Sequence, residues 1–238
     1  MAQSRLQVFC DRLEQELRPH LDLTSEHPHH PVIVRHCPSP WYYVGTGNYA
    51  AVVAHPDFPA WVVKVYAPHR EGFAAEVEVY RRLGTHAAFS ECYYAKDGIL
   101  VLRRLHGTTL YDCAHRGIPI PRKVIEDIDQ ALDYVYAQGL NPHDVHGKNV
   151  MLGVDGRGLV VDISDFLKPE PCYAWKDLKR AYYCLYRPLI AGLKLKIPYA
   201  FLDQVRTVYR VYRRLGDRLF LLQGKSVDVN GLQHLRSQ

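Results

Sequence analysis

The segment of residues 139–166 constrains the fold of this chain more than any other. Two short apolar runs, 150–152 and 159–161, flank a turn that contains three glycines. Apolar runs on either side of such a turn predict a β-hairpin. Asn149 enters this hairpin, and Asp162 leaves it 13 positions later. The two strands therefore bring an amide and a carboxylate side chain to the same end of the hairpin.

These two side chains, together with Asp144 five positions before Asn149, are candidates for chemistry. Amide and carboxylate oxygens suit a hard divalent cation such as Mg²⁺, so Asn149 and Asp162 are candidate metal ligands. Asp144 lies on a predicted loop, where its carboxylate can orient a hydroxyl group or accept its proton. Asp and Asn are also common loop formers, so Asp144 and Asn149 taken alone leave a purely structural interpretation open.

The order and spacing of these residues resemble the catalytic loop and metal-binding segment of the protein-kinase-like superfamily. The resemblance implies that Asp144 is the catalytic aspartate and that Asn149 binds Mg²⁺. It matches Asp162 to the metal-binding aspartate of the family's D-F-G element. Asp165 also precedes a phenylalanine, but it lies 16 positions after Asn149, whereas the family's spacing is that of Asp162. We therefore predict that Asp165 is a turn residue or supports the site indirectly.

The chain departs from the family pattern at three points. Residues 162–164 read Asp-Ile-Ser in place of D-F-G, and residues 142–144 read Pro-His-Asp in place of H-R-D. His146 stands where Ser/Thr kinases usually carry a lysine. A histidine at this point is more similar to aminoglycoside phosphotransferases and small atypical kinases. The whole pattern looks most like the compact, atypical bacterial Ser/Thr kinases.

A second motif lies upstream, in residues 41–53, where a predicted strand enters a Gly-x-Gly turn formed by Gly45 and Gly47 and a second strand leaves it. Glycines allow the backbone to approach a phosphate without a side-chain clash. A plain hairpin turn explains the same pattern. The motif resembles the glycine-rich loop of kinases, with Ala50 in place of the third glycine, and the resemblance implies that Gly45 and Gly47 contact ATP.

Lys64 lies inside an apolar strand predicted over residues 61–66. A buried ammonium group is costly unless its charge is paired. The resemblance assigns Lys64 to the α- and β-phosphates of ATP, and it assigns Glu76, on a helix predicted over 73–84, as the partner of Lys64. Glu78 lies about 200° around that helix from Glu76, so only one of the two can face the site. A solvated helix face is the alternative for each glutamate.

Three further assignments concern the middle of the chain. After a predicted strand at 99–102, the resemblance implies a hinge in which Arg103 replaces the usual acidic residue and the backbone of Leu105 contacts adenine. Apolar residues at helical spacing predict a buried helix over 121–139 that leads into the Asp144 loop. Asp177 is either the family's aspartate that braces this loop or an exposed residue at a helix start.

The two ends of the chain carry predicted helices. Helical spacing of apolar residues predicts a helix over 3–18, and a proline-rich linker with one edge strand is predicted over 24–40. A final helix or helix pair is predicted over 199–222, and residues 224–238 are predicted to be poorly ordered. The inner face of the final helix is predicted to contain Leu202, Val205, Tyr209 and Tyr212. Its basic side contains Arg206, Arg210, Arg213, Arg214 and Arg218, and it is either a solvated face or a site for an acidic partner or RNA.

Composition limits the class of protein. The 238 residues carry a net charge of +5, which is compatible with an anionic ligand such as ATP and does not require nucleic acid. No apolar run approaches the roughly 20 residues that a membrane span needs, and the N-terminus lacks the apolar core of a signal peptide. The six cysteines are scattered without a Cys-x-x-Cys pair. They indicate reduced thiols, and we expect a cytoplasmic protein.

These observations predict an α+β protein with the bilobal protein-kinase-like fold. We expect an N-terminal helix and linker at 1–40, a mainly β N-lobe at 41–102 and a mainly helical C-lobe at 103–238. The implied function is transfer of the γ-phosphoryl group of ATP, with Mg²⁺, to a hydroxyl, most simply as a serine/threonine protein kinase. One alternative is a small-molecule or sugar kinase, which His146 and the short segment after Asp162 favour. Another is a nucleotide-binding regulator or ATPase with little transferase activity.

Overall fold

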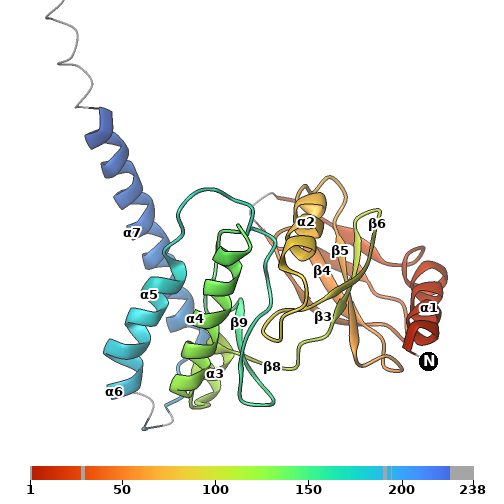
Figure 1. Ribbon diagram of the computed structural model, residues 1–238, viewed down its shortest axis with the longest axis horizontal. Coiled ribbons are helices and arrows are strands. Elements are labelled where there is room, and N and C mark those ends of the chain that lie inside the picture. The colour runs from red at the N-terminus through yellow and green to blue at the C-terminus, as the bar shows by residue number, and fades with distance from the viewer. Residues whose placement is uncertain (1, 28–29, 190–191, 194, 226–238) are drawn as a thin grey trace, which may run out of the picture.

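The computed structural model describes residues 2–27, 30–189, 192–193 and 195–225. The segment predicted over 224–238 to be poorly ordered lies outside the described residues except for 224 and 225, which are helical, so the prediction is wrong at these two positions. The chain is α+β: an antiparallel sheet dominates its first half and helices dominate its second half (Figure 1). This is compatible with a kinase-like fold. None of the helices in the described part combines the length and the hydropathy that a transmembrane span requires.

The main sheet has five antiparallel strands in the order β3-β4-β5-β7-β6. Four of these strands were predicted above, and the fifth, β6, contains the run Tyr93-Tyr94-Ala95, whose composition also predicts a strand. The central strands are buried on both faces, which explains why their sequences are almost continuously apolar. The strands are β3 (Tyr42–Thr46), β4 (Ala50–Ala54), β5 (Trp61–Tyr66), β6 (Cys92–Lys96) and β7 (Ile99–Arg103).

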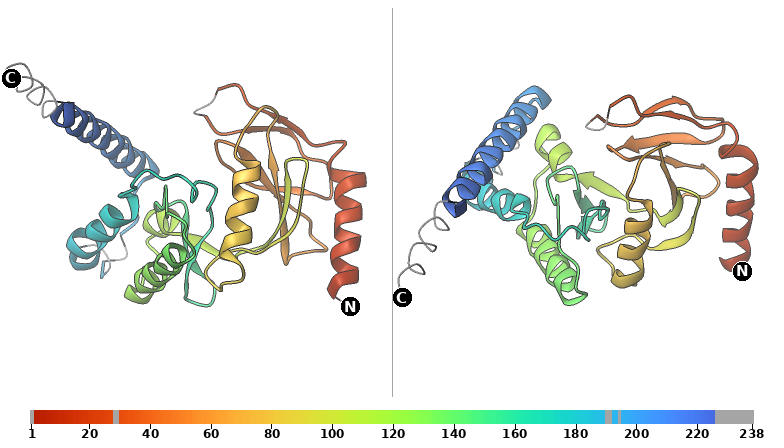
Figure 2. Two further views of the ribbon diagram at one scale, coloured as in Figure 1. Left: turned by 45° about the horizontal axis from the view of Figure 1, so that its top comes forward. Right: turned by 90° about the horizontal axis from the view of Figure 1, so that it is seen from above.

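Two helices cover the two faces of this sheet (Figure 2). The first is α1 (Ala2–Arg12), which continues as a π-helical turn, η1 (Leu13–Leu17), and the second is α2 (Phe73–Leu83). Side chains alternate between the faces of a strand, so neighbouring residues enter different clusters. Val63 packs with the first helix and Val62 with the second. The helix predicted over 3–18 thus forms part of the core of the sheet region.

The proline-rich stretch before the sheet contains more structure than the single predicted strand. It forms a two-stranded antiparallel sheet of β1 (Asp22–Thr24) and β2 (Ile33–His36). Val32 is buried with Ala51, and its backbone N–H donates to the carbonyl oxygen of Gly47 at 2.9 Å. This small sheet is therefore attached to the glycine-containing turn between β3 and β4.

The second half of the chain is built on a three-stranded sheet in the order β10-β9-β8. The predicted hairpin is present as β9 and β10, whereas β8 and the helix after it were not predicted. Gly158 lies against the helix that precedes the hairpin so closely that a Cβ atom would be 2.4 Å from the carbonyl oxygen of Val124. The elements are β8 (Gly107–Thr109), α3 (Leu110–Arg116), α4 (Arg122–Ala137), β9 (Val150–Gly153) and β10 (Gly158–Val160).

The last elements that the structure describes are helices, which lie beside α3 and α4 (Figure 1). They are α5 (Ala174–Ala181), a π-helical turn η2 (Tyr182–Tyr186), α6 (Arg187–Leu189) and α7 (Tyr199–Lys225). Helix α7 was predicted, and it runs past α5 so that its later turns project away from the rest of the protein (Figure 2).

The inner face predicted for α7 is partly wrong. Val205 and Tyr212 are 52% and 68% exposed. The contacts of α7 with the body come instead from polar and aromatic residues at helical spacing, which are Tyr199, Asp203, Arg206, Tyr209 and Arg213. The periodicity of apolar residues predicted the wrong contact face because this helix docks mainly through hydrogen bonds of polar side chains. Of the predicted basic side, Arg206 and Arg213 contact the body, and the side chains of the other three arginines lie outside the described residues.

Candidate functional site

The ion pair predicted between Lys64 and Glu76 is present. Strand β5 places Lys64 opposite helix α2, and its Nζ lies 2.8 Å from Oε1 of Glu76. The Glu76 side chain is only 1% exposed, and the hydroxyl of Tyr66, two residues along β5, donates to its other carboxylate oxygen. Glu78 is on the outer side of α2, where it pairs with arginines one turn away. The helical register is therefore the one that the sequence predicted.

Asp162 joins this pair from the end of the β9–β10 hairpin. Its Oδ1 lies 3.4 Å from Nζ of Lys64 and accepts the backbone N–H of Ser164 at 3.2 Å. Asp165, the alternative metal ligand, instead pairs with Lys168 at 2.8 Å and lies 3.9 Å from a ring nitrogen of His143. The structure thus brings Asp162 to the Lys64–Glu76 pair and directs Asp165 elsewhere.

The charges of this cluster stabilise one another. Burial lowers the pKa of Lys64, but attraction by Asp162 and Glu76 outweighs it and holds this pKa well above the usual value. Burial likewise acts to raise the pKa of Asp162, and the Lys64 charge with the Ser164 hydrogen bond lowers it on balance. At neutral pH the cluster therefore presents a charged ammonium group beside an ionised Asp162.

Asp144 lies on the loop that precedes β9, and its backbone has a φ of 56°, in the left-handed region. A residue other than glycine adopts this conformation at a cost of about 1–3 kcal/mol, and such residues cluster at functional sites. The side chain is 54% exposed and open to a ligand. Although the side chain is half exposed, the surrounding loops partly desolvate its carboxyl and raise the pKa, and the nearby charges of Asp165 and Asp162 add to the rise, while His146 opposes it.

Asn149 connects this loop to the hairpin. Its Nδ2 donates to the backbone carbonyl of Asp144 at 3.0 Å. Its own backbone carbonyl accepts the N–H of Val161 at 3.0 Å, which places the next residue, Asp162, beside it. Among the described residues no donor reaches the amide oxygen of Asn149. The loop conformation therefore leaves one amide oxygen and one carboxylate adjacent to each other.

His146 stands between Asp144 and helix α7. Its Nε2 lies 3.8 Å from Oδ2 of Asp144 and 3.4 Å from Nη2 of Arg206. Burial lowers the pKa of His146, and the positive charge of Arg206 lowers it further, although the carboxylate of Asp144 opposes both effects. The ring is therefore neutral at neutral pH and does not replace the positive charge of the lysine that Ser/Thr kinases carry here.

Of the two glycines of the predicted glycine-rich loop, Gly45 lies near the end of β3, opposite Val52, and Gly47 lies in the turn between β3 and β4. A Cβ atom added to Gly45 or Gly47 would meet nothing within 4 Å, and neither residue has a φ in the left-handed region. The described part of the protein therefore gives no steric reason for glycine here, whereas a ligand that approaches the backbone would. The N–H of Gly47 already donates to the carbonyl of Ala50, so Gly47 offers space and no free donor.

Of the two residues predicted for the hinge, only Leu105 has backbone groups that a nucleotide could reach. The N–H of Arg103 donates to the carbonyl of Glu91, its carbonyl accepts the hydroxyl of Ser90, and its guanidinium donates to the carbonyl of Phe89. These contacts leave Arg103 no free backbone group for a base. Within the ranges that the structure describes, the backbone of Leu105 makes no hydrogen bond, so an adenine contact depends on Leu105 alone.

Among the described residues, Asp177 makes no hydrogen bond or ion pair with the Asp144 loop, so the bracing role implied by the resemblance is not seen. Its carboxylate on α5 accepts the hydroxyl of Tyr209 at 2.8 Å and the guanidinium of Arg213, both on α7. The loop is held instead by the segment that follows Phe166. Asn141 donates through its side chain to the carbonyls of residues 168 and 170, and the N–H of Asp144 approaches the sulfur of Cys172 at 3.3 Å. These contacts explain how a short segment after Asp162 can still fix the loop.

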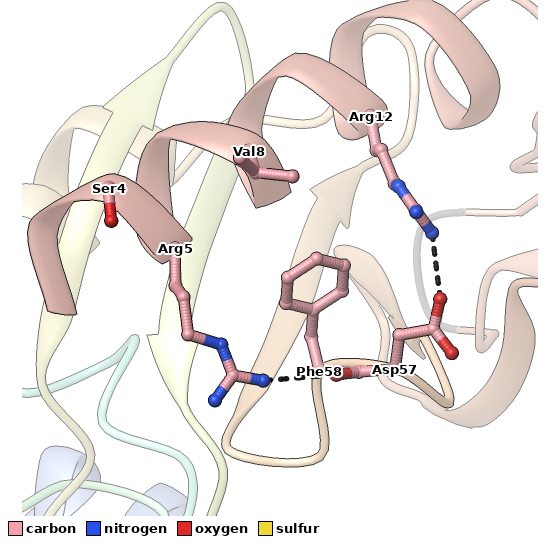
Figure 3. Close-up of a pocket in the computed structure, with 6 residues that line it drawn as sticks. All are labelled: Ser4, Arg5, Val8, Arg12, Asp57 and Phe58. Carbon is pink, nitrogen blue, oxygen red and sulfur yellow. Dashed lines mark hydrogen bonds and ion pairs between the residues drawn. The ribbon is translucent and has the colours of Figure 1, made fainter. Parts of the chain in front are cut away.

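Two surface cavities accompany these elements. One, of about 500 Å³, lies where α7 meets α3 and the catalytic loop, and it is lined by Thr109, Tyr111, Asp112, Lys148, Tyr199 and Asp203. The other, of about 320 Å³, lies under α1, where Arg12 reaches Asp57 at 2.9 Å (Figure 3). None of the predicted site residues lines either cavity. The first adjoins the Asp144 loop through Lys148, whereas the second is lined by α1 and the segment around Asp57.

Sequence reasoning missed two residues of this site. Tyr66 was visible only as another apolar strand residue, although its position two after Lys64 places it on the same face of β5. Arg206 was visible only as one of five basic residues on the last helix. Neither signal alone identifies a contact with Glu76 or with His146, because both contacts join segments far apart in the sequence.

Comparison with known proteins places the chain in a family. No family model matches it. It is 32% identical over 149 residues to the "Putative serine/threonine-protein kinase YrzF" of Bacillus subtilis (strain 168), and this match covers 62% of the chain and 68% of the relative. The chain belongs to the same family as that protein, which supports a kinase-like phosphotransferase.

Proposed function

We propose that this protein is an ATP-dependent serine/threonine protein kinase that transfers the γ-phosphoryl group to a hydroxyl. The observation that carries the proposal is the convergence of Lys64, Glu76 and Asp162 from three separate segments, with Asp144 on the adjacent loop. The printed name of the Bacillus subtilis relative supports the same class of reaction. The boundaries 41–102 and 103–238 for two lobes, and a cytoplasmic location, are part of this proposal. The six free thiols agree with the proposed location.

The nucleotide would be held by groups that the structure has already oriented. Lys64, fixed by Glu76, would bind the α- and β-phosphates, the open backbone at Gly45 and Gly47 would admit them, and Leu105 would contact adenine. Such contacts position the phosphate chain for transfer, and positioning with charge stabilisation supplies most of the catalysis in kinases.

The donor set fits Mg²⁺. Asn149 offers an amide oxygen and Asp162 a carboxylate, and both are hard oxygen ligands. In the described part of the chain, no group of three or more His, Cys, Asp or Glu residues could hold a metal by itself. A cation bound here would take further ligands from the phosphate oxygens, as Mg²⁺ does in kinases, and would neutralise the charge of the phosphates.

Asp144 would orient the acceptor hydroxyl and accept its proton. Its carboxylate is exposed enough to meet an acceptor. The pKa of this carboxyl is raised towards neutral pH, which favours proton transfer from the hydroxyl. The strained backbone at this residue agrees with a conformation retained for function.

A small-molecule kinase is the second candidate. The cavity of about 500 Å³ beside the catalytic loop has the size of a small-ligand site. It combines tyrosine side chains with the carboxylates of Asp112 and Asp203, which suits a hydroxylated ligand as well as a protein side chain.

The test is a transfer assay with ATP radiolabelled at the γ-phosphate. The acceptors are the chain itself, a Ser/Thr-rich model protein, an aminoglycoside and water, each with and without Mg²⁺. Labelled protein supports the serine/threonine kinase, and labelled aminoglycoside supports the small-molecule kinase. Phosphate released to water alone, or ATP binding without any transfer, would indicate an ATPase or a nucleotide-binding regulator and would overturn the proposal.

A further inference from the structure

Arg206 is a half-buried arginine beside the catalytic loop that forms no ion pair with a carboxylate in the part of the chain the structure describes, although its charge contributes to the lowered pKa of Asp203 one turn before it. Among the described residues, its guanidinium hydrogen-bonds only with Nε2 of His146, at 3.4 Å. The backbone N–H of Lys148 already approaches Nδ1 of the same ring at 3.3 Å. A neutral imidazole accepts at one nitrogen only, so it can satisfy one of these two donors. At most one of the five guanidinium donors of Arg206 is therefore bound within the described part of the protein, and the others are available to solvent or to a ligand.

The position of Arg206 is fixed from both sides along α7. One turn before it, Asp203 accepts the hydroxyl of Tyr111 at 2.7 Å and pairs with Lys148 at 3.4 Å. One turn after it, Tyr209 donates to Asp177 on α5 at 2.8 Å. Helix α7 is thus held against α3, the catalytic loop and α5. The guanidinium of Arg206 is therefore presented by a helix that is docked on both sides of it, as precise recognition requires.

The other cations near the loop already have carboxylate partners. Lys64 pairs with Glu76 and Asp162, Lys148 pairs with Asp203, and Lys168 pairs with Asp165. Arg206 and Asp144 both approach Nε2 of His146, at 3.4 Å and 3.8 Å, so the guanidinium lies in the neighbourhood of the Asp144 carboxylate.

We propose that Arg206 is a catalytic residue that binds the phosphoryl group during transfer and supplies the positive charge that the lysine-to-histidine replacement at His146 removes. A guanidinium presents donors in a planar fork that matches two oxygens of a phosphoryl group. The inference rests on the proposed phosphotransferase function and names a further residue of that site.

The step balances as follows. The acceptor hydroxyl gives its proton to the Asp144 carboxylate, and the acceptor oxygen forms a bond to the γ-phosphorus. The bond from that phosphorus to the bridging oxygen breaks, and ADP leaves with the electron pair. Negative charge on the equatorial oxygens of the phosphoryl group is bound by Arg206 while the phosphoryl group is between donor and acceptor.

The experiment compares Arg206→Ala, Arg206→Lys and the control Gln204→Ala, an exposed residue of the same helix. We expect Arg206→Ala to lower kcat about 10²–10³-fold, the loss typical of removing one donor to a developing negative charge. The KM values for ATP and acceptor should change little, and Arg206→Lys should retain part of the rate. Millimolar guanidinium added to Arg206→Ala should restore part of the activity, which a purely structural role would not allow.

Each other outcome overturns the inference. A raised acceptor KM with unchanged kcat would mean that Arg206 binds an anionic acceptor. A lowered melting temperature without rescue by guanidinium would mean that Arg206 only docks α7. If the wild-type protein transfers phosphate and Arg206→Ala does so at full rate, the inference about Arg206 fails while the proposed function stands. If the wild-type protein transfers none, both fail.

Discussion

Replacing Lys64 by methionine should destabilise the protein because it leaves the carboxylate of Glu76 buried without a positive partner. Glu76 is 1% exposed, and the remaining donor to it is the hydroxyl of Tyr66. Breaking a buried pair by removing one partner costs about 3–5 kcal/mol. Glu76→Gln keeps an acceptor for Tyr66 and leaves Lys64 with Asp162 at 3.4 Å, so it should cost about 1–3 kcal/mol.

The double variant Lys64→Met/Glu76→Gln removes both charges together. We expect it to be more stable than Lys64→Met alone, because a buried pair replaced by neutral groups of similar volume is often close to neutral in stability. The free energies of unfolding come from urea denaturation without nucleotide, followed by tryptophan fluorescence. Glu78→Gln, on the exposed side of the same helix, is the matched control and should change stability little. If the stability losses of the two single variants add up to the loss of the double variant to within about 0.5 kcal/mol, the two residues do not interact as a buried pair.

Two further predictions concern the core of the sheet region and the metal site. His55 is fully buried, and burial lowers its pKa, so the unfolded chain binds a proton that the native protein excludes. Stability should therefore fall as pH drops below about 6.5, by up to about 1.4 kcal/mol per pH unit. His55→Gln should flatten the pH profile of urea unfolding, and an unchanged profile would show that His55 is not the group responsible. Asp162→Ala should abolish Mg²⁺-dependent transfer while Asp165→Ala retains substantial activity, and the reverse pattern in two folded variants would mean that the metal ligand is misassigned.

The main sheet and the Lys64–Glu76 contact were predictable because local patterns determine them. Continuous apolar runs indicated the central strands. The geometry of a helix places Glu76 and Glu78 on different sides of α2, so only Glu76 can face Lys64. The pairing then followed from a single lysine in an apolar strand, which needs a partner.

Contacts formed by short or polar segments could not be predicted in this way. The three residues of β8 include a glycine and two threonines, so no apolar pattern marked the strand. Asp177 and Arg213 belong to a polar contact between two helices, and the sequence of each helix contains no trace of the other. Arg103 was expected at a nucleotide because of its position after β7, yet its donors satisfy the carbonyls of the segment before β6.

The proposed function depends most on Asp144, which we propose orients and deprotonates an acceptor hydroxyl without holding ATP. The direct measurement is phosphate transfer from γ-labelled ATP by Asp144→Asn, together with ATP affinity measured by calorimetry on the same variant. Asp155→Asn, an exposed residue of the β9–β10 turn, is the control. We expect transfer by Asp144→Asn to fall about 10²–10⁴-fold while ATP affinity stays within a few-fold of wild type. Undiminished transfer, or loss of ATP binding in a variant that remains folded, would contradict it.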